Sequence, residues 1–249
     1  MAIPSREIMK AISQKKYLVY YQPKVDAQTE ALMGFEALVR LKVGKEVLTP
    51  EQFFEEMMAI QAGVDMQHFV VAEVLEQVNA FQGQFSISVN IPAPFFMMDL
   101  YMDEIYTRIK RDCKFPQQLT LEIIERGEIT ELESARRNIQ RLKTLGLKVV
   151  MDDFGKGYSS LTYLRALPID GLKTDRSFIS LIKHDDKQRT IIQAIINLSH
   201  DIGGKIVIEG VEDEEQIRLL RDMKADYFQG YYYGKPMPID EAIRKFHLY

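Results

Sequence analysis

The sequence lacks several features that would mark other kinds of protein. Its 249 residues include one cysteine, Cys113, which excludes an intramolecular disulfide and any metal site built on cysteine. No stretch approaches the roughly 18 apolar residues of a membrane span, and residues 1–16 contain no long apolar core, so we expect a cytoplasmic protein. Because low-complexity segments and linkers rich in proline or glycine are also absent, we expect one domain over residues 1–249.

An excess of positive charge is lacking too. Lysine and arginine total 32 residues against 36 acidic ones, which gives a net charge of -4 and a pI near 5.7. Domains that bind DNA or RNA polymers usually present a basic surface. We therefore expect no nucleic-acid polymer as a partner. An anionic nucleotide would need local positive charge instead, from metal ions and a few basic side chains.

Segments typical of strands and helices alternate along the chain. The helical segments are 4–15, 65–81, 100–113, 187–202 and 213–223, with two more opened by capping boxes at Thr49–Gln52 and Thr130–Glu133. The strand segments are 17–25, 31–41, 85–91, 119–124, 147–153, 170–175, 205–210 and 226–230. This alternation predicts an α/β fold, a TIM-like (β/α)8 barrel. The first two strands are joined by a turn too short for a crossover, so we expect an antiparallel pair near the start and residues 1–16 as a helix leading in.

Acidic and amide side chains, together with one lysine, recur at the ends of the apolar runs. They are Glu36, Asn90, Glu122, Asp152, Asp153, Lys173, Asp175, Glu209 and Gln229. The C-terminal ends of barrel strands converge on one mouth, where active sites are built. Carboxylates gathered there would repel one another unless positive charge lay among them, and divalent cations are the natural candidates. Any one of these residues alone is more often a solvated loop or turn residue, but their joint placement favours a site.

These motifs resemble those of the EAL domain family, the metal-dependent phosphodiesterases that cleave the bacterial second messenger cyclic di-GMP. FEALVRL looks like the family signature, and ISVNI, LTLEIIE, KVVMDDFGKGYSS, GLKTD, KIVIEGVE and YFQGYYYGKP follow in the family's order. The resemblance runs from YYQPKV to QGYYYGKPMP and so covers nearly the whole chain. It implies a barrel that departs from eight parallel strands at its start, and hydrolysis of cyclic di-GMP to the linear dinucleotide pGpG.

The resemblance also implies two ions of Mg²⁺ or Mn²⁺ in each active site, which activate water and clamp the reacting oxygens. One ion is expected on Glu36, Asn90, Glu122 and Asp152, and Asp152 is expected to bridge to a second ion shared with Asp153 and Glu209. Oxygen ligands disfavour zinc, and none of the four histidines lies in the motifs. Ca²⁺ is expected to inhibit because of its larger radius and looser geometry. Glu209 is either a ligand or a general base; we favour the ligand.

Further roles follow from the resemblance. Lys173 is expected to orient the attacking water, and Asp175, two residues on along the same strand, is expected to partner it. Glu212 and Gln229 are expected to hold waters and ligands in place. The residues expected near the guanine and phosphate of the substrate are Gln22, Leu38, Arg40 and Lys235.

Three positions depart from the family pattern without removing an expected ligand. Lys156 replaces a threonine, and Pro92 replaces the last serine of the family motif SVNxS. Arg126 replaces a serine next to the retained Glu125. In the family, the loop after DDFG and the glutamate at Glu125 couple the active site to a dimer interface. We therefore expect a homodimer, and we expect Lys156 to affect loop order and dimer coupling more than metal binding.

Two other functions compete with the enzyme. The chain can be a catalytically weak or inactive receptor for cyclic di-GMP, or a module that binds a regulatory protein partner and ignores the nucleotide. The retained carboxylates favour the phosphodiesterase, because degenerate members of the family typically lose them.

Overall fold

A computed structural model describes residues 3–124, 127–155 and 160–248, and within these ranges eight strands close into a barrel. The order around the barrel is β1-β9-β8-β7-β6-β5-β4-β2, closed by pairing of β1 with β2, and β3 extends β2 on the outside. The strands are β1 Tyr17–Asp26, β2 Leu32–Val43, β3 Glu46–Leu48, β4 Ser86–Pro92, β5 Leu119–Ile124, β6 Lys148–Phe154, β7 Gly171–Thr174, β8 Lys205–Glu209 and β9 Tyr227–Gln229.

The antiparallel start of the barrel is confirmed. Strand β1 runs antiparallel to both of its neighbours, β2 and β9, whereas β2, β4, β5, β6, β7, β8 and β9 are parallel to one another. The turn between β1 and β2 is fixed by Asp26, whose carboxylate accepts hydrogen bonds from the backbone N–H groups of Gln28 at 3.0 Å and Thr29 at 2.8 Å. A tight turn of this kind can join only antiparallel neighbours.

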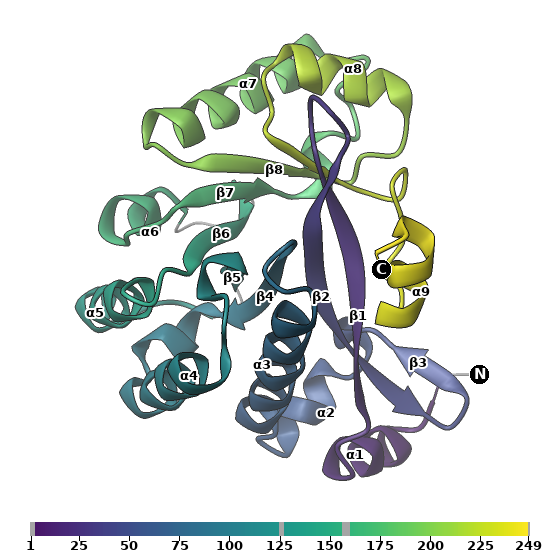
Figure 1. Ribbon diagram of the computed structural model, residues 1–249, viewed down its shortest axis with the longest axis vertical. Helices are drawn as coiled ribbons and strands as arrows, with labels where there is room; N and C mark the ends of the chain where they lie inside the picture. Colours follow the sequence, from purple (N-terminus) through teal and green to yellow (C-terminus); the bar gives the residue numbers. More distant parts are fainter. Residues whose placement is uncertain (1–2, 125–126, 156–159, 249) are drawn as a thin grey trace.

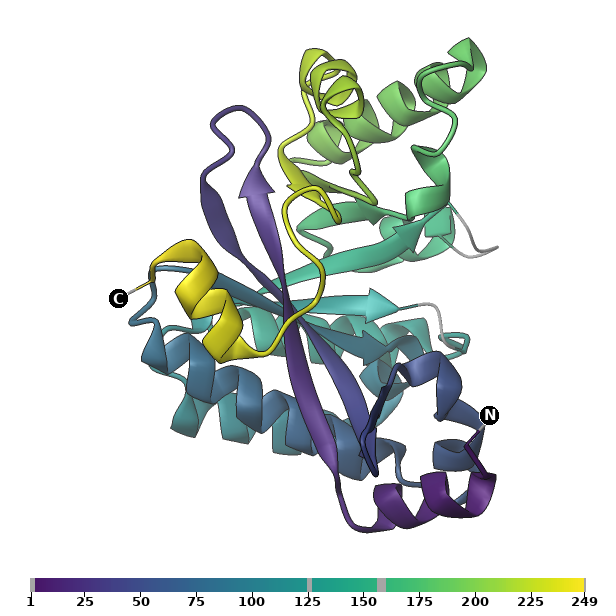
Figure 2. The ribbon, with the colours of Figure 1, turned by 90° about the vertical axis from the view of Figure 1, so that its right-hand side faces the viewer.

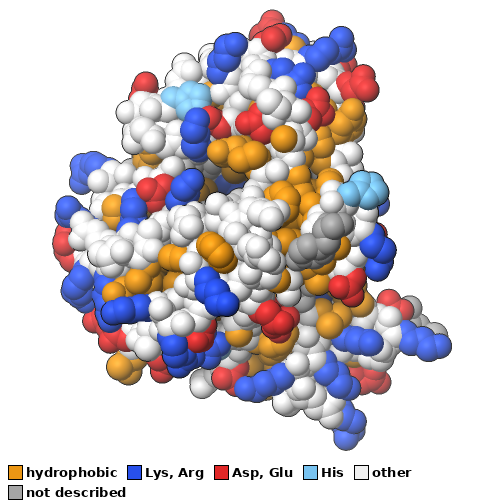
Figure 3. Space-filling model, viewed as in Figure 1, with side chains coloured by type: hydrophobic (Ala, Val, Ile, Leu, Met, Phe, Trp, Pro, Cys, Tyr) orange, Lys and Arg blue, Asp and Glu red, His pale blue; other side chains and the backbone are white. Residues whose placement is uncertain are grey.

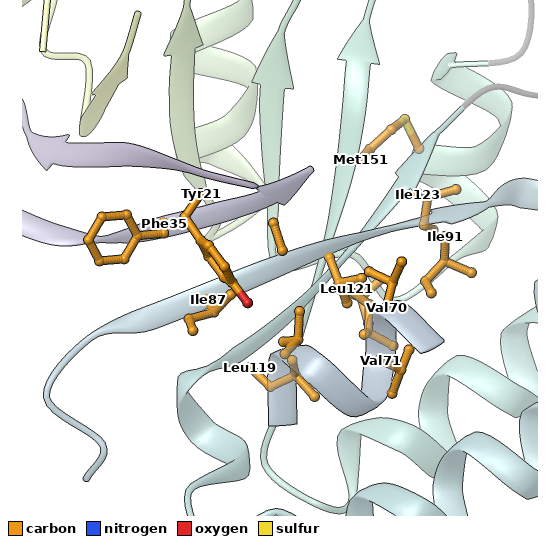
Figure 4. Close-up of a cluster of buried hydrophobic side chains, with 14 of the residues drawn as sticks. Tyr21, Phe35, Val70, Val71, Ile87, Ile91, Leu119, Leu121, Ile123 and Met151 are labelled. Carbon is orange, nitrogen blue, oxygen red and sulfur yellow. The ribbon is translucent and has the colours of Figure 1, made fainter. Parts of the chain in front are cut away.

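Helices cover the outside of the barrel (Figure 1). They are α1 Ser5–Ser13, α2 Phe54–Ala59, α3 Gly63–Ala80, α4 Asp99–Asp112, α5 Leu132–Lys143, α6 Ser160–Ala166, α7 Asp186–Asp201, α8 Glu214–Asp222 and α9 Ile239–Phe246. Val70 and Val71 of α3 belong to the same cluster of buried side chains as Ile91 of β4 and Leu121 of β5 (Figure 4). The barrel strands are therefore buried on both faces, which explains their nearly continuous apolar runs.

The predicted capping box at Thr130 is wrong. Helix α5 begins one residue later, with Glu131 as its N-cap and no side-chain cap. The backbone N–H groups of Thr130 and Glu131 each lie 3.1 Å from the sulfur of Met97, and the Thr130 hydroxyl lies 3.6 Å from it. A tertiary contact with the preceding segment therefore replaces the local cap. At Thr49 the box is present, but it opens a 3-10 turn, Pro50–Gln52, that precedes α2.

Besides the short 3-10 turns, three elements lie outside the predicted set: strand β3, helix α6 and helix α9. Helix α9 starts directly after Pro238 and packs beside β1, as the two views turned by 90° show (Figures 1 and 2). None of these three elements carries a predicted site residue.

Candidate active site

The predicted strand-end residues meet at the C-terminal mouth of the barrel. Three pairs of them lie directly opposite each other on neighbouring strands: Gln22 and Glu36, Asn90 and Glu122, and Glu209 and Gln229. Neighbouring strands of a closed barrel present such residues to a common interior. Glu36, Glu122 and Gln229 are almost completely buried, at 3%, 1% and 2% exposure.

Among the described residues the carboxylates form two groups whose ligand atoms lie within 4.8 Å of one another. The first group is Glu36, Glu122 and Asp152, and the second is Asp152, Asp153 and Glu209. Asp152 belongs to both groups. The sequence assigned the same carboxylates to two ions, with Asp152 between them.

The ammonium of Lys173 lies among these carboxylates. Its Nζ is 2.8 Å from Glu36 Oε2, 2.9 Å from Glu122 Oε2, 3.4 Å from Asp152 Oδ2 and 2.7 Å from Glu209 Oε1. Burial disfavours the charge, but the surrounding carboxylates outweigh it and hold the pKa of Lys173 well above its usual value. Lys173 is therefore positively charged and acts in this site as a hydrogen-bond donor, not as a base.

The carboxylates differ in how strongly they hold protons. Burial acts against ionisation of Glu122, but Lys173 and Lys24 both face it and lower its pKa to about 2. Burial raises the pKa of Glu209 to about 7, with Lys173 opposing the shift. Burial also raises the pKa of Asp152, whose contact with Lys173 is the longest of the four and which has three other carboxylates around it. Glu122 is therefore ionised at neutral pH.

Two consecutive aspartates reach the mouth because β6 is irregular at its end. In a regular strand, neighbouring side chains point to opposite faces. The register of β6 against β7 shifts between Met151 and Phe154, and Asp153 has a φ of 52°. This left-handed backbone, which aspartate tolerates better than most residues, lets Asp153 approach Asp152 and Glu209.

Two amides support the carboxylates. Asn90 donates from Nδ2 to Glu36 Oε1 at 2.6 Å, and its backbone carbonyl accepts from Gln67 at 2.8 Å. Gln229 donates from Nε2 to Glu36 Oε2 at 2.5 Å and to Gln22 Oε1 at 3.1 Å. The side-chain oxygens of Asn90 and Gln229 are buried without a hydrogen-bond partner in the described part of the chain.

This donor set fits a hard divalent cation. Among the described residues the Asn90 Oδ1 atom is buried without a hydrogen-bond partner, on a side chain that contacts Glu36 of the first carboxylate group. Oxygen donors of this kind suit Mg²⁺ or Mn²⁺. A bound cation would also explain why Asn90 is found here, because burying its side-chain oxygen without a partner costs free energy.

A cavity of about 390 Å³ adjoins the acidic residues. Its lining includes Glu36, Asn90 and both aspartates, together with the apolar side chains of Met57 and Met66. The predicted substrate residues Gln22, Leu38 and Arg40 all line this cavity. The Arg40 guanidinium donates to the carbonyl of Val39 at 2.8 Å and lies 5.7 Å from the ring of Tyr20.

A smaller cavity of about 140 Å³ shares Gln22 and Glu209 with the first. Glu212 is exposed and lines this second cavity, together with Arg176 and Tyr231. Lys235 is exposed, and its ammonium lies 5.2 Å from the Tyr231 ring. The face in Figure 3 carries acidic and basic side chains interspersed.

Some predicted roles are not resolved by this arrangement. Asp175 lies just past the end of β7 and caps a 3-10 turn by accepting from the N–H of Ser177 at 2.9 Å, so its partnership with Lys173 stays a prediction. Glu125, Arg126 and Lys156 lie outside the described residues.

Sequence reasoning did not assign a role to Lys24, Ser88 or Gln67, all of which are buried and contact predicted site residues directly or through one another. The available signal was a lysine inside an apolar strand, two residues after Gln22 and therefore on the same face.

The protein is thus a modified (β/α)8 barrel with a buried acidic cluster at the C-terminal ends of its strands. More specifically, the chain belongs to the EAL domain family, whose model matches residues 5–236. No helix in the described ranges combines the length and apolarity needed to cross a membrane.

Known relatives are similar over nearly the whole chain. The bifunctional diguanylate cyclase/cyclic di-GMP phosphodiesterase MucR of Pseudomonas aeruginosa is 32% identical over 95% of the chain, which covers 35% of MucR. The probable cyclic di-GMP phosphodiesterase PdeN of Escherichia coli is 30% identical over 97% of the chain, which covers 47% of PdeN. The chain thus spans less than half the length of these two curated relatives.

Solved structures are similar as well. An EAL domain protein from Listeria monocytogenes is 52% identical, with a TM-score of 0.97 and complete coverage of both chains. The MucR phosphodiesterase in complex with cyclic di-GMP is 31% identical, with a TM-score of 0.85 over 95% of this chain and 98% of that one.

Proposed function

We propose that the protein is a phosphodiesterase that adds water across one phosphodiester of cyclic di-GMP and releases the linear dinucleotide pGpG. The observation that carries the proposal is the pair of carboxylate groups that share Asp152 around the ammonium of Lys173. Membership of the EAL domain family and similarity to a relative solved with cyclic di-GMP support the choice of substrate.

Mg²⁺ or Mn²⁺ is the proposed cofactor, held by Glu36, Asn90, Glu122 and Asp152 at one position and by Asp152, Asp153 and Glu209 at the other. When bound, such ions lower the pKa of water and stabilise charge on phosphoryl oxygens. Glu209 is proposed as a ligand. Ca²⁺ is expected to inhibit, because it prefers longer bonds and higher coordination numbers than Mg²⁺.

The protein's own residues have distinct proposed roles. Lys173 keeps its proton on Nζ and donates a hydrogen bond that orients the attacking water. Arg40 presents its planar guanidinium to a substrate phosphate from the wall of the larger cavity, where Gln22 and Leu38 also contact the nucleotide. Asp175 supports Lys173, and Glu212 and Gln229 hold waters and ligands in place. The exposed Lys235 contacts the substrate at the edge of the site.

The test is to incubate the purified protein with cyclic di-GMP and either Mg²⁺ or Mn²⁺ and to separate the nucleotides by chromatography. We expect pGpG to accumulate. Its formation should stop in excess EDTA and should be inhibited by Ca²⁺. The matched control is Asp152→Asn, which removes the shared charge at nearly constant volume. Binding of cyclic di-GMP without turnover in either metal would instead identify a receptor, and an absence of binding would identify a module with another partner.

A further inference from the structure

A second buried lysine, Lys24, faces the acidic cluster from inside the barrel. Its Nζ donates to Ser88 Oγ at 2.7 Å and lies 3.4 Å from Glu122 Oε1. Lys24 and Ser88 are 7% and 0% exposed. A buried ammonium needs partners that compensate for its lost hydration, and here the partners are one hydroxyl and one carboxylate oxygen.

The topology explains why this lysine lies beneath the site. Strand β1 runs antiparallel to the other barrel strands, so the step from Gln22 to Lys24 leads away from the mouth. Ser88 precedes Asn90 by two residues on β4, one inward-facing position deeper. Lys24 therefore reaches Glu122 from one position deeper in the barrel than Gln22, and it does not line the open cavity.

The two oxygens of Glu122 consequently have different surroundings. Oε2 lies 2.9 Å from Lys173 Nζ, the atom that also contacts Glu36 and Asp152, so Oε2 faces the acidic group. Oε1 faces Lys24. A cation held by the first carboxylate group is thus offered one oxygen of Glu122, while the ammonium below keeps the other oxygen engaged.

We propose that Lys24 is a positioning residue that restricts Glu122 to ligation through one oxygen and thereby selects small octahedral cations against Ca²⁺. Mg²⁺ binds six ligands in a nearly ideal octahedron, usually with single carboxylate oxygens, whereas Ca²⁺ takes six to eight oxygens and often both oxygens of a carboxylate. Freeing Oε1 of Glu122 gives the larger ion an additional ligand and gives Mg²⁺ no comparable benefit. This inference rests on the proposed metal-dependent function.

The experiment compares Lys24→Met with the wild type, because methionine has similar length and no charge. Lys143→Met is the matched control: Lys143 pairs with Asp170 at 2.6 Å in a half-buried ion pair that lies outside both cavities of the site. Dissociation constants for Mg²⁺, Mn²⁺ and Ca²⁺ are measured by titration calorimetry on metal-stripped protein without substrate. The ratio of the Ca²⁺ to the Mg²⁺ constant cancels the general gain in cation affinity that follows from removing a positive charge.

We expect this ratio to fall at least tenfold in Lys24→Met and to stay unchanged in Lys143→Met. Ser88→Ala, which loosens Lys24 without removing its charge, should move the ratio in the same direction by a smaller factor, and it serves as the test if Lys24→Met does not fold. A ratio within threefold of wild type in the folded variants overturns the role of Lys24 and leaves the phosphodiesterase proposal standing. If the wild type binds none of the three ions, both proposals are overturned.

Discussion

At the scale of single residues, charge compensation dominates the site. Four carboxylates lie within 3.4 Å of the Lys173 ammonium, and all of these groups are largely buried. Coulomb interactions are strong in such surroundings, so removing one charge affects every neighbour. Each substitution in the site is therefore expected to change metal affinity, stability and turnover together, and the measurements below separate these effects.

Asp152→Asn should be among the most damaging single changes. Asp152 is the carboxylate common to both groups, and an amide there cannot balance the charge of two ions. We expect kcat to fall at least a hundredfold, and the number of Mn²⁺ ions bound per chain, measured by titration calorimetry, to drop. Activity within a few-fold of wild type would show that Asp152 does not bridge.

Lys173→Ala and Arg40→Ala should fail in different ways. The lysine is proposed to act on the water, so its loss should lower kcat with a modest effect on substrate binding. The arginine lines the cavity and is proposed to hold a phosphate, so its loss should weaken binding and lower kcat/KM. Kinetics together with direct measurement of cyclic di-GMP binding make the comparison; normal binding by both variants would refute the role given to Arg40.

Glu209 gives the protein a pH-dependent stability that Glu209→Gln should remove. Burial raises the pKa of Glu209 to about 7, above the ordinary value of 4.5 in an unfolded chain. The folded state therefore holds the proton more tightly, and the wild type loses stability as the pH rises from 4.5 through 7, by at most about 3 kcal/mol.

Urea unfolding of metal-stripped wild type and Glu209→Gln at pH 5 and pH 8 measures this effect. The free energy of unfolding of the variant minus that of the wild type should be larger at pH 8 than at pH 5. An equal difference at both pH values would mean that the carboxyl ionises normally.

At the scale of elements, the end of β6 decides whether a second acidic group exists. Asp153 takes a left-handed backbone conformation, which Asn and Asp adopt more readily than other residues with a Cβ. Asp153→Asn should retain stability while weakening the binding of one ion. Asp153→Ala should unfold at lower urea concentration than Asp153→Asn, by roughly 1 kcal/mol in the free energy of unfolding. Equal stability of the two variants would argue against a backbone requirement at this position.

Most elements were predictable because their signals are local. The apolar periodicity of β5 and the stop signal Gly203-Gly204 after α7 gave bounds within one residue. The failure at Thr130 has a tertiary cause, because Thr130 contacts the sulfur of Met97, which is distant in sequence. Helix α9 did have a local signal: acidic residues in its first turn, basic residues in its last turn, and Ile239, Ile243 and Phe246 at helical spacing.

At the scale of the whole molecule, the proposed assembly is a homodimer, coupled to the active site through the loop after DDFG. Lys156 adds a positive charge to that loop, in a region outside the described residues. We expect Lys156→Thr to keep or raise activity and to shift the dimerisation constant, whereas Glu125→Ala should lower activity without removing a ligand. Sedimentation equilibrium and kinetics over a series of protein concentrations test both; loss of activity in Lys156→Thr would make the lysine a working part of the site.

The sequence by itself determined the alternation of strands and helices, the antiparallel start of the barrel and the set of oxygen donors at the strand ends. These follow from patterns of period 2 and 3.6 and from turn chemistry, which act over a few residues. The resemblance to the family already implied two groups of ligands that share Asp152. Only the tertiary structure decided that Lys173 lies among four carboxylates, that a left-handed backbone brings Asp153 to the mouth, and that Lys24 contacts Glu122. The physical reason is that barrel closure sets the distances between strands far apart in sequence, and the charge and burial of each group depend on those distances.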